Sequence, residues 1–480
     1  LYYALAAIYS VPFNDESLDD LIWHNPGFGY QAPGTVPDNK NMLVHTEVED
    51  RWPWPEAVLA VRSARLASLF FGALTVIAAW GLAYETFIDR RAALITATLV
   101  AFHPQFVFMS GVVNNDVSAA ALATAVLWMV ARILRRGLSL RYVALTGALV
   151  GLAALAKTSA LLVAPLAGAA ILWAGWREER SWAEILKLLV LYTAIALAVG
   201  GWWYARNILL YGDPLGLTSH VQTLWGRPEP ISLLQLIPEL PLLIRSFWGA
   251  YGWGHVWWPD GVYVLLTLVA FWFLGCTFWS LLRFAVCVLR SECRVSAERR
   301  REQGMLALAL FWFGLILAAL LRWMTLVEAP HGRLLFPAIG AWALLVGAGS
   351  GEIPDKAPLG EARRFVFRLF LLFLVVLATL APGARILATF APPRLRSPEA
   401  VLREVTPVGL DYEDRARLLG ISVEPERVNP GDSVEVSACW EALRPMSQDY
   451  TVFVQLLGPE NIVVGERRTY PGLGRFPTSI

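Results

Sequence analysis

The chain has 480 residues, of which 56% are hydrophobic and 16% charged, and its formal net charge is +1. Soluble domains carry about 25% charged residues, so this composition excludes an ordinary soluble protein, and the small net charge gives no indication of a nucleic-acid partner. The four cysteines include no C-x-x-C pair, and they therefore indicate neither a zinc site nor a disulfide framework.

Membrane-spanning helices are predicted for most of the chain. The first ten residues are apolar but too short to span a membrane and predict an interfacial helix, and an acidic loop rich in proline and tryptophan follows, to residue 60. Beyond it, apolar runs long enough to cross about 30 Å of hydrocarbon recur without the polar face of a soluble helix. They predict ten spans, at residues 64–84, 92–110, 117–133, 142–156, 158–175, 187–205, 261–283, 305–322, 333–349 and 366–384.

Basic residues gather in every second connection between these spans. Cytoplasmic connections are enriched in Lys and Arg, so the alternation predicts that these connections face the cytoplasm. The other connections, the loop before residue 60 and the C-terminal region are then predicted to lie outside. The basic set contains Arg90 and Arg91; Arg132, Arg135, Arg136 and Arg141; Arg177, Arg180 and Lys187; Arg283, Arg290, Arg294, Arg299, Arg300 and Arg301; and Lys356, Arg363, Arg364 and Arg368.

The C-terminal region predicts a β domain. After a linker rich in Pro and Arg, apolar and polar residues alternate over Val434–Trp440, and strand-like runs follow at Tyr450–Leu457 and Ile462–Val464. The expected fold class is a polytopic α-helical membrane protein with a partial C-terminal β-sandwich. The predicted domains are an extracytoplasmic loop with interfacial helices (1–60), a multi-span transmembrane domain (61–384), the linker (385–407) and the partial extracytoplasmic sandwich (408–480).

Polar residues at the outer ends of spans are the candidate functional residues, because charge within a membrane is costly and usually functional. Asn115 and Asp116 precede the third span. Asp116 could coordinate a metal ion or position one bound to phosphate. Asn and Asp before a helix can equally cap its free N–H groups, and both interpretations can hold together.

Two basic residues follow at the outer ends of later spans. Lys157 lies in a short break between the fourth and fifth spans, where an ammonium can bind a lipid phosphate; the alternative is a lysine that extends to the interface on its flexible stem. Arg206 follows Trp202-Trp203-Tyr204, a sequence typical of the interfacial aromatic belt. It could bind phosphate or pair with Asp213.

Two later outer segments complete the candidate set. Trp253 lies in an aromatic stretch interrupted by glycines, which suits either sugar stacking or interfacial anchoring. His331 and Arg333 lie where the ninth span begins. An Arg facing lipid would be costly, so we expect Arg333 to face a cavity; a salt bridge to Glu328 is the alternative.

Several short sequences, taken in order, resemble one known group of membrane proteins. They cover most of residues 1–350 and are similar to bacterial members of the GT-C superfamily related to family 39 glycosyltransferases, which include protein mannosyltransferases and lipid A aminoarabinose transferases. The sequences are Leu1-Tyr2-Tyr3-Ala4-Leu5, Phe102-His103-Pro104-Gln105-Phe106, Asn114-Asn115-Asp116, Gly151–Lys157, Trp202–Asn207, Tyr211-Gly212-Asp213-Pro214 and His331–Pro337.

The resemblance implies a glycosyltransferase of a bacterial-type cytoplasmic membrane. Such enzymes move a sugar, with inversion, from a polyprenyl-phosphate donor to an extracytoplasmic glycan, lipid or protein acceptor. Asp116 matches the second acidic outer-loop position, Lys157 a position near the lipid phosphate, and His331 and Arg333 a late motif near the donor. A divalent metal is possible, but the need for one differs across the superfamily, so the metal ligands stay unassigned.

The same resemblance predicts that the chain is truncated at both ends. It begins at Leu1 without a methionine, and it ends at Ile480 within a β-like pattern. In the family the general base is a carboxylate of the first outer loop that precedes the equivalent of Leu1-Tyr2-Tyr3, so we expect this base and one further span to lie before Leu1.

Two other classes of protein stay open. A lipid or glycan transporter or flippase would place ionisable groups near the bilayer midplane and show related halves, whereas here the polar residues lie at one face and no repeat is evident. The other alternative is a non-catalytic membrane scaffold that bears a carbohydrate-binding β module. An Asp or Glu shortly before Leu1 in the intact protein would favour the enzyme.

Overall fold

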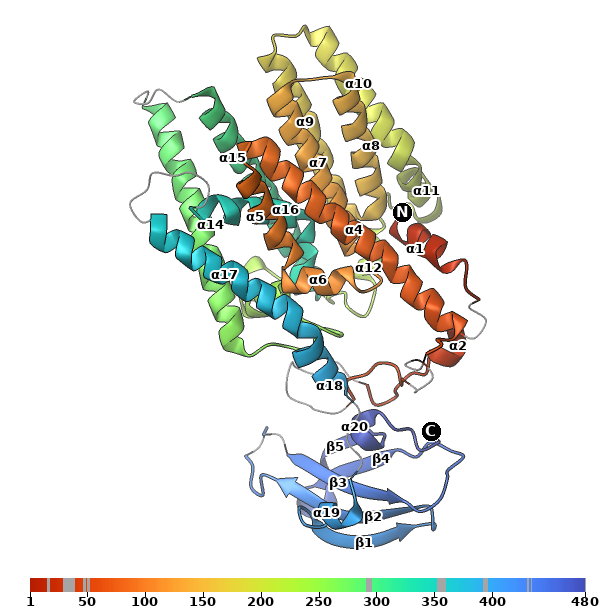
Figure 1. Cartoon of the computed structure of the whole chain (residues 1–480). Coiled ribbons are helices and arrows are strands. Elements are labelled where there is room, and N and C mark those ends of the chain that lie inside the picture. The colour runs from red at the N-terminus through yellow and green to blue at the C-terminus, as the bar shows by residue number, and fades with distance from the viewer. Residues whose placement is uncertain are drawn as a thin grey trace. The chain divides into compact units, whose positions relative to one another are not determined.

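The computed structural model describes residues 1–14, 18–28, 39–45, 49, 52–290, 296–351, 360–391, 396–429, 431–432 and 434–479 (Figure 1). The chain forms two compact units. Unit 1 comprises Leu1–Phe13 and Leu59–Arg385, and unit 2 comprises Asn14–Val58 and Ile386–Ile480. Each unit therefore combines segments that are far apart in the sequence.

Unit 1 is helical. In chain order its elements are α1 (Tyr2–Ser10), α4 (Glu56–Phe87), α5 (Arg90–Ala101), α6 (Pro104–Ser110), α7 (Asp116–Arg136), α8 (Leu140–Ala156), η1 (Thr158–Leu162), α9 (Val163–Arg177), α10 (Trp182–Ala196), η2 (Leu197–Gly201), α11 (Trp202–Tyr211), α12 (Leu217–Val221), η3 (Leu233–Glu239), α13 (Leu240–Trp248), α14 (Asp260–Leu289), α15 (Ala297–Met324), η4 (Gly332–Ala338), α16 (Ile339–Gly349), α17 (Gly360–Leu380) and η5 (Ala381–Leu387).

The predicted spans are all present as apolar helical segments. Among the described residues, eight helices are long and apolar enough to cross a membrane, or nine if the bent pair α5–α6 is one span, and α8 is a shorter apolar helix. The predicted fold class is confirmed. Cys287 in α14 is disulfide-bonded, which the sequence analysis did not predict, whereas Cys276 and Cys439 are free.

The span at residues 92–110 is broken rather than straight. Its two halves, α5 and α6, meet at an angle of 67°. Pro104 disfavours helical backbone at the residue before it, and His103 is accordingly extended and caps α6, its ring Nδ1 accepting a hydrogen bond from the Phe106 N–H at 3.4 Å. The proline that breaks the span thus begins the next helix.

The centre of unit 1 is built on small residues. Among the long apolar helices that the structure describes, α7 and the η4–α16 span are the most buried. In each of them, 83% of the most apolar stretch is buried inside the protein. A Cβ added to Gly340 would lie 2.4 Å from Cγ2 of Thr124 on α7, so the absence of a side chain is what lets the two backbones approach.

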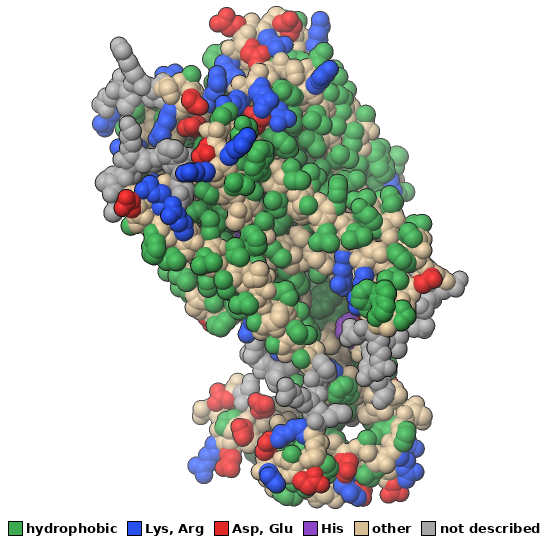
Figure 2. Space-filling view, in the orientation of Figure 1, with side chains coloured by type: hydrophobic (Ala, Val, Ile, Leu, Met, Phe, Trp, Pro, Cys, Tyr) green, Lys and Arg blue, Asp and Glu red, His purple; other side chains and the backbone are tan. Residues whose placement is uncertain are grey.

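Basic side chains gather at one end of unit 1. Figure 2 shows them over the connections α9–α10 and α14–α15, beyond a broad hydrophobic surface. At this end the buried Glu85 carboxylate pairs with Arg132 at 2.9 Å and with Arg136 at 2.7 Å. A buried carboxylate needs such partners, so part of the basic set stabilises the fold.

Unit 2 contains two antiparallel sheets. β1 (Thr406–Tyr412), β2 (Ala416–Glu424) and β3 (Glu435–Ala442) pair in the order β1-β2-β3, and β4 (Val452–Leu457) pairs with β5 (Val463–Thr469). Short helices α2 (Leu18–Leu21), α18 (Ala388–Phe390), α19 (Pro398–Val401), η6 (Pro459–Asn461) and α20 (Pro471–Gly474) complete it. The sequence predicted strands at the positions of β3, β4 and β5.

The sequence did not predict β1 and β2. Every residue of β1 is exposed, and the strand contains Pro407 and Gly409, two residue types that are depleted in strands. Gly409 also has a positive φ of 68°, which interrupts the regular register with β2. The completion of these sheets into a sandwich stays a prediction.

The first long loop packs against these strands within unit 2. The side-chain amide of Asn39 donates to the carbonyl of Arg468 at 3.1 Å. The backbone N–H of Asn39 donates to the carbonyl of Leu473 at 2.9 Å. The Asn25 amide donates to the carbonyl of Gly474 at 3.4 Å. Both asparagines are buried, so the loop and the strands form one structural unit although more than 400 residues separate the bonded pairs.

Candidate functional site

Three of the predicted residues lie together at the ends of three helical elements. The ammonium of Lys157, after α8, donates to Oδ1 of Asp116 at the start of α7. Nε of Arg333, in η4, lies 3.6 Å from Oδ2 of Asp116. The Asp116 side chain is only 8% exposed. One buried carboxylate is thus shared by two cations, and we call Asp116, Lys157 and Arg333 the cation cluster.

The turn before α7 leaves the Asp116 carboxylate free for these partners. The Asn114 side chain caps the helix, because its Oδ1 accepts hydrogen bonds from the backbone N–H groups of Asp116 at 2.9 Å and Val117 at 3.4 Å. Asn115, in turn, donates to the carbonyl of Ala156 at 3.3 Å. The capping alternative therefore holds for Asn114 and not for Asp116, and Asn115 fastens the start of α7 to the end of α8.

The break between α8 and η1 directs Lys157. Its backbone is extended, with φ −163° and ψ 141°, while helix continues on both sides. The side chain is 25% exposed and its ammonium bonds to Asp116. Lys157 therefore does not extend to the interface, which was the alternative interpretation of this lysine.

A close backbone contact positions Arg333. A Cβ on Gly332 would lie 2.2 Å from the backbone N of Phe247 in α13, so only glycine fits here. The Gly332 N–H donates to Oγ of Ser246 at 2.8 Å, and this hydroxyl lies 3.1 Å from the carbonyl of Pro330. These contacts fasten the segment before Arg333 to α13.

The predicted alternative for Arg333, a salt bridge to Glu328, is wrong. Arg333 faces Asp116 instead, and Glu328 lies 3.8 Å from the guanidinium of Arg227. The tight turn at Gly332 separates the two side chains, although only four residues lie between them in the sequence.

His331 lies beside the cation cluster and is neutral. Burial lowers its pKa to about 4, and the positive charge of Arg333 contributes to this shift, while the negative charge of Asp116 opposes it. A neutral imidazole can both donate and accept a hydrogen bond, so His331 offers the site a polar group without a further charge.

Two polar side chains that the sequence analysis left without a role support the site. Tyr2 is 1% exposed, and its hydroxyl lies 2.6 Å from Oγ of Ser68 and accepts a hydrogen bond from the Asn114 N–H at 3.0 Å. Ser68 donates to the carbonyl of Val112 at 2.6 Å. The presence of Tyr2 in one of the family-like sequences was the only signal for this arrangement.

Arg206 and Trp253 are not among the residues whose ion pairs define the cation cluster. The Arg206 guanidinium lies 4.9 Å from the ring centre of Trp203 and 5.9 Å from that of Tyr211. In the part of the chain that the structure describes, no ion pair joins Arg206 to the cation cluster. Trp253 is 57% exposed, in a tight turn closed by a bridge between Tyr251 and Val256.

The predicted alternative for Arg206, a pair with Asp213, is also wrong. The Asp213 carboxylate accepts from the backbone and hydroxyl of Thr218, both at 2.8 Å, and from the Leu215 N–H at 3.0 Å. These bonds lower the pKa of Asp213 to about 2. Asp213 thus stabilises the turn into α12, and Arg206 stacks on aromatic rings.

The cation cluster does not fit a metal ion. Among the described residues no group of three or more His, Cys, Asp or Glu side chains could hold one. Asp116 already pairs with the positive charges of Lys157 and Arg333. These two charges would repel a metal cation that approached the same carboxylate.

One part of unit 1 matches the sequence model of a known family. Residues 60–204 match the model of the dolichyl-phosphate-mannose-protein mannosyltransferase family. This segment includes the bent span, Asp116, Lys157 and the sequence Trp202-Trp203-Tyr204. The predicted resemblance is confirmed for this segment. No curated protein sequence matches the chain.

Solved structures of membrane glycosyltransferases show partial similarity. ArnT from Cupriavidus metallidurans, bound to undecaprenyl phosphate, is 15% identical with a TM-score of 0.40, over 79% of this chain and 64% of that one. Its apo state is 16% identical with a TM-score of 0.39, over 80% and 67%. An oligosaccharyltransferase from Archaeoglobus fulgidus, tethered to an acceptor peptide, is 14% identical with a TM-score of 0.38, over 83% and 53%. The chain thus spans between about half and two thirds of these proteins.

Proposed function

We propose that the chain is a membrane glycosyltransferase that moves a sugar from a polyprenyl-phosphate donor to an extracytoplasmic glycan, lipid or protein acceptor. The cation cluster is the observation that carries the proposal. Lys157 and Arg333 bring two positive charges against the single negative charge of Asp116. This excess positive charge lies where helices end and suits a lipid-linked phosphate. The match of residues 60–204 to a family that uses dolichyl-phosphate mannose supports the same class of donor.

In the proposed reaction the bond between the anomeric carbon and the phosphate oxygen breaks, and its electron pair leaves with the phosphate. The acceptor hydroxyl or amine forms the new bond to the anomeric carbon and gives its proton to a general base. Lys157 and Arg333 stabilise the charge that develops on the departing phosphate. Asp116 holds both cations in place before the donor arrives, and neutral His331 offers a hydrogen bond to the donor. Outside the cation cluster, Arg206 is proposed to contact phosphate and Trp253 to stack on sugar.

Location and orientation are part of the proposal. The basic end of unit 1 is proposed to face the cytoplasm of a bacterial-type inner membrane, because cytoplasmic connections are enriched in Lys and Arg. The C-terminal strands are proposed to lie outside. A membrane-impermeant thiol reagent applied to intact cells should label a cysteine placed at Ser447 and not one placed at Ser296. The opposite labelling pattern would show that the orientation is inverted.

A transfer assay tests the activity. Intact gene product is given a radiolabelled polyprenyl-phosphate sugar, and both the acceptor fraction and the lipid fraction are counted. Asp116→Asn should lower kcat/KM at least tenfold, about 1.4 kcal/mol. Asp19→Asn, at an exposed acid of the first loop, should change it little.

The outcome also separates the enzyme from a transporter. A flippase would move the labelled lipid between leaflets of a liposome without any transfer of label to acceptor. That result would replace the proposed function with the transporter alternative.

A further inference from the structure

His103, at the bend between α5 and α6, is enclosed by aromatic rings from three other elements. Its side chain is fully buried. The imidazole stacks on Trp248 of α13, with ring centres 5.3 Å apart, and meets Phe247 of α13 edge to face at 4.6 Å. Phe336 of η4 and Trp342 of α16 also meet it edge to face, at 5.8 and 5.4 Å. One ring thus joins the bend to α13, η4 and α16.

The His103 ring is itself held in place from α6. Its Nδ1 accepts from the Phe106 N–H, and the next side chain, Gln105, accepts from the Ala250 N–H at 2.6 Å, which fastens α6 to the turn after α13. In the part of the chain that the structure describes, Nε2 of His103 has no hydrogen-bond partner. Apart from capping α6, the imidazole therefore serves as a packing surface for the surrounding rings.

η4, which carries Arg333, depends on its neighbours for its shape. It is a 3-10 helix of seven residues, and such helices have poorer hydrogen-bond geometry than α-helices and rarely run beyond four residues. Its first residue, Gly332, is held by the hydrogen bond to Ser246. Farther along, Phe336 is fully buried and makes the ring contact with His103. Aromatic packing therefore supplies support that the backbone of η4 lacks.

Arg333 and Phe336 lie on the same side of η4, because residues three apart in a 3-10 helix eclipse each other. The seat of the Phe336 ring thus sets the direction in which Arg333 points. Nε of Arg333 is buried and has no hydrogen-bond partner among the described residues. It lies 3.6 Å from Oδ2 of Asp116, which is longer than a hydrogen bond. The carboxylate attracts the guanidinium without fixing its geometry, so η4 must hold Arg333 in place.

We propose that His103 is a positioning residue of the site. Its ring seats Phe336, and Phe336 holds η4 in the rotation that directs Arg333 at Asp116. His103 acts only through η4. The inference rests on the proposed function for what Arg333 then does, which is to stabilise the departing phosphate, but the position of Arg333 can be tested without any substrate.

A double-mutant cycle measures whether Arg333 faces Asp116. Asp116→Asn, Arg333→Met and the double variant of the intact gene product are unfolded with denaturant in detergent, and their non-additivity gives the coupling of the pair. The cycle is repeated with His103→Leu and with His103→Phe. Both lose the Nδ1 acceptor and only phenylalanine keeps a ring, so their difference isolates the ring contact.

The coupling between Asp116 and Arg333 should fall below half its wild-type value with His103→Leu and stay above half with His103→Phe. Unchanged coupling in folded His103→Leu protein, an equal loss in both variants, or no coupling in the wild type would overturn the inference. If His103→Leu fails to fold, Phe336→Leu decides instead, because it removes the same contact from the η4 side and leaves the cap of α6. It should lower the coupling equally, and unchanged coupling would overturn the inference.

A second buried ring provides the matched control. Phe273 of α14 is fully buried and packs against Phe367 and Phe370 of α17, with ring centres 5.2 and 6.0 Å away. Phe273→Leu should lower the melting temperature and leave the coupling between Asp116 and Arg333 unchanged. A loss of coupling as large as that with His103→Leu would mean general loosening of the fold and would overturn the positioning role.

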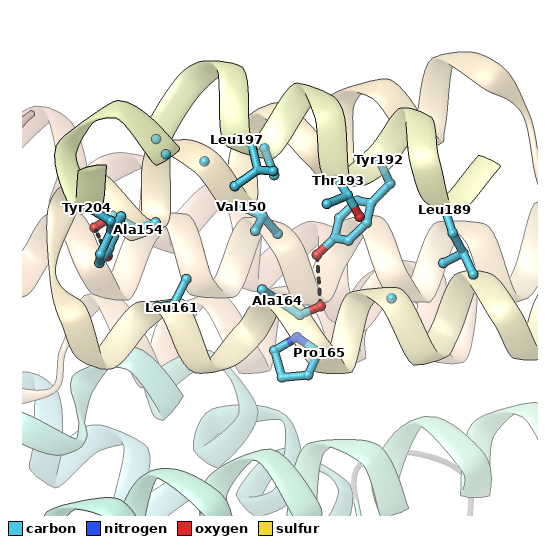
Figure 3. A pocket seen from close by; sticks show the side chains of 15 residues that line it. Val150, Ala154, Leu161, Ala164, Pro165, Leu189, Tyr192, Thr193, Leu197 and Tyr204 are labelled. Atoms are coloured by element: carbon cyan, nitrogen blue, oxygen red, sulfur yellow. Dashed lines mark hydrogen bonds between the residues drawn. The ribbon is translucent and has the colours of Figure 1, made fainter. Parts of the chain in front are cut away.

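The other cation of the cluster is an internal control. Lys157 follows α8, and the end of α8 is fastened separately, because the Tyr204 hydroxyl donates to the carbonyl of Ala154 at 2.8 Å where both residues line an apolar pocket (Figure 3). The coupling between Asp116 and Lys157 should therefore be the same with and without His103→Leu. An equal loss of both couplings would show that His103 supports the fold as a whole, and it would refute the positioning role.

The two proposals fail in different ways. In the transfer assay, His103→Leu should lower kcat/KM for the donor at least tenfold, about as much as Arg333→Met, and the double variant should lose little more. If the coupling depends on the His103 ring but the wild type transfers no sugar, the enzyme is refuted and the positioning role stands. If His103→Leu protein transfers sugar with the kcat/KM of the wild type, the positioning role is refuted and the enzyme stands.

Discussion

Lys157→Met is the substitution that tests the cation cluster most directly. Methionine keeps most of the apolar stem of lysine and removes its ammonium, so the change acts mainly on the ion pair with Asp116. Breaking a buried pair by removing one partner costs about 3–5 kcal/mol. Arg333 stays 3.6 Å from the other carboxylate oxygen, and the Lys157 side chain is 25% exposed. We therefore expect a smaller loss of folding free energy, about 1–3 kcal/mol.

A double-mutant cycle separates this pair from unrelated effects. Lys157→Met, Asp116→Asn and the double variant are compared by denaturant unfolding in detergent, and the coupling free energy should be at least about 1 kcal/mol. Lys187→Met is the matched control, because Lys187 is exposed on α10, and its free energy of unfolding should change by less than about 0.5 kcal/mol. A coupling near zero would mean that the ammonium extends to the interface and that the pair does not form.

The remaining predictions concern the segment that carries Arg333. Gly332→Ala should lower the free energy of unfolding by about 1–3 kcal/mol or more, because its Cβ would overlap the α13 backbone; an unchanged melting temperature would contradict this packing. Ser246→Ala should cost about 1–3 kcal/mol, because the buried Gly332 N–H loses its acceptor; Ser246→Thr should retain part of the stability. The lowered pKa of His331, about 4 against 6.5 when unfolded, means that its contribution to stability is present above pH 6.5 and is lost as the pH falls toward 4. His331→Gln should therefore reduce the loss of stability between pH 6.5 and 4 in thermal unfolding, and an identical pH profile would refute the assignment.

The sequence alone determined the membrane architecture. A span must present a run of apolar side chains about as long as the hydrocarbon is thick, and this requirement is local, so each span could be placed without knowledge of its neighbours. Pro104 likewise breaks its span for a local reason, the missing N–H and the restricted residue before it. Asp116, Lys157 and Arg333 could be selected one by one, because a charged residue at the end of a span is costly to expose to lipid.

Which charges pair was decided only by the tertiary structure. Arg333 is five positions from Glu328 and yet faces Asp116, because Gly332 packs against α13 and turns the chain. Arg206 similarly stacks on Trp203 instead of pairing with Asp213.

In unit 2, too, contacts between distant parts of the chain decided what the sequence could not. The strand β1 forms by pairing with β2 although it contains Pro407 and Gly409, and the bond from Asn39 to Arg468 joins residues 429 positions apart. Local propensity and periodicity depend on neighbours in the chain, whereas such contacts depend on where helices and strands pack. The sequence therefore predicts the elements and the candidate residues, and the packing of the elements determines the site.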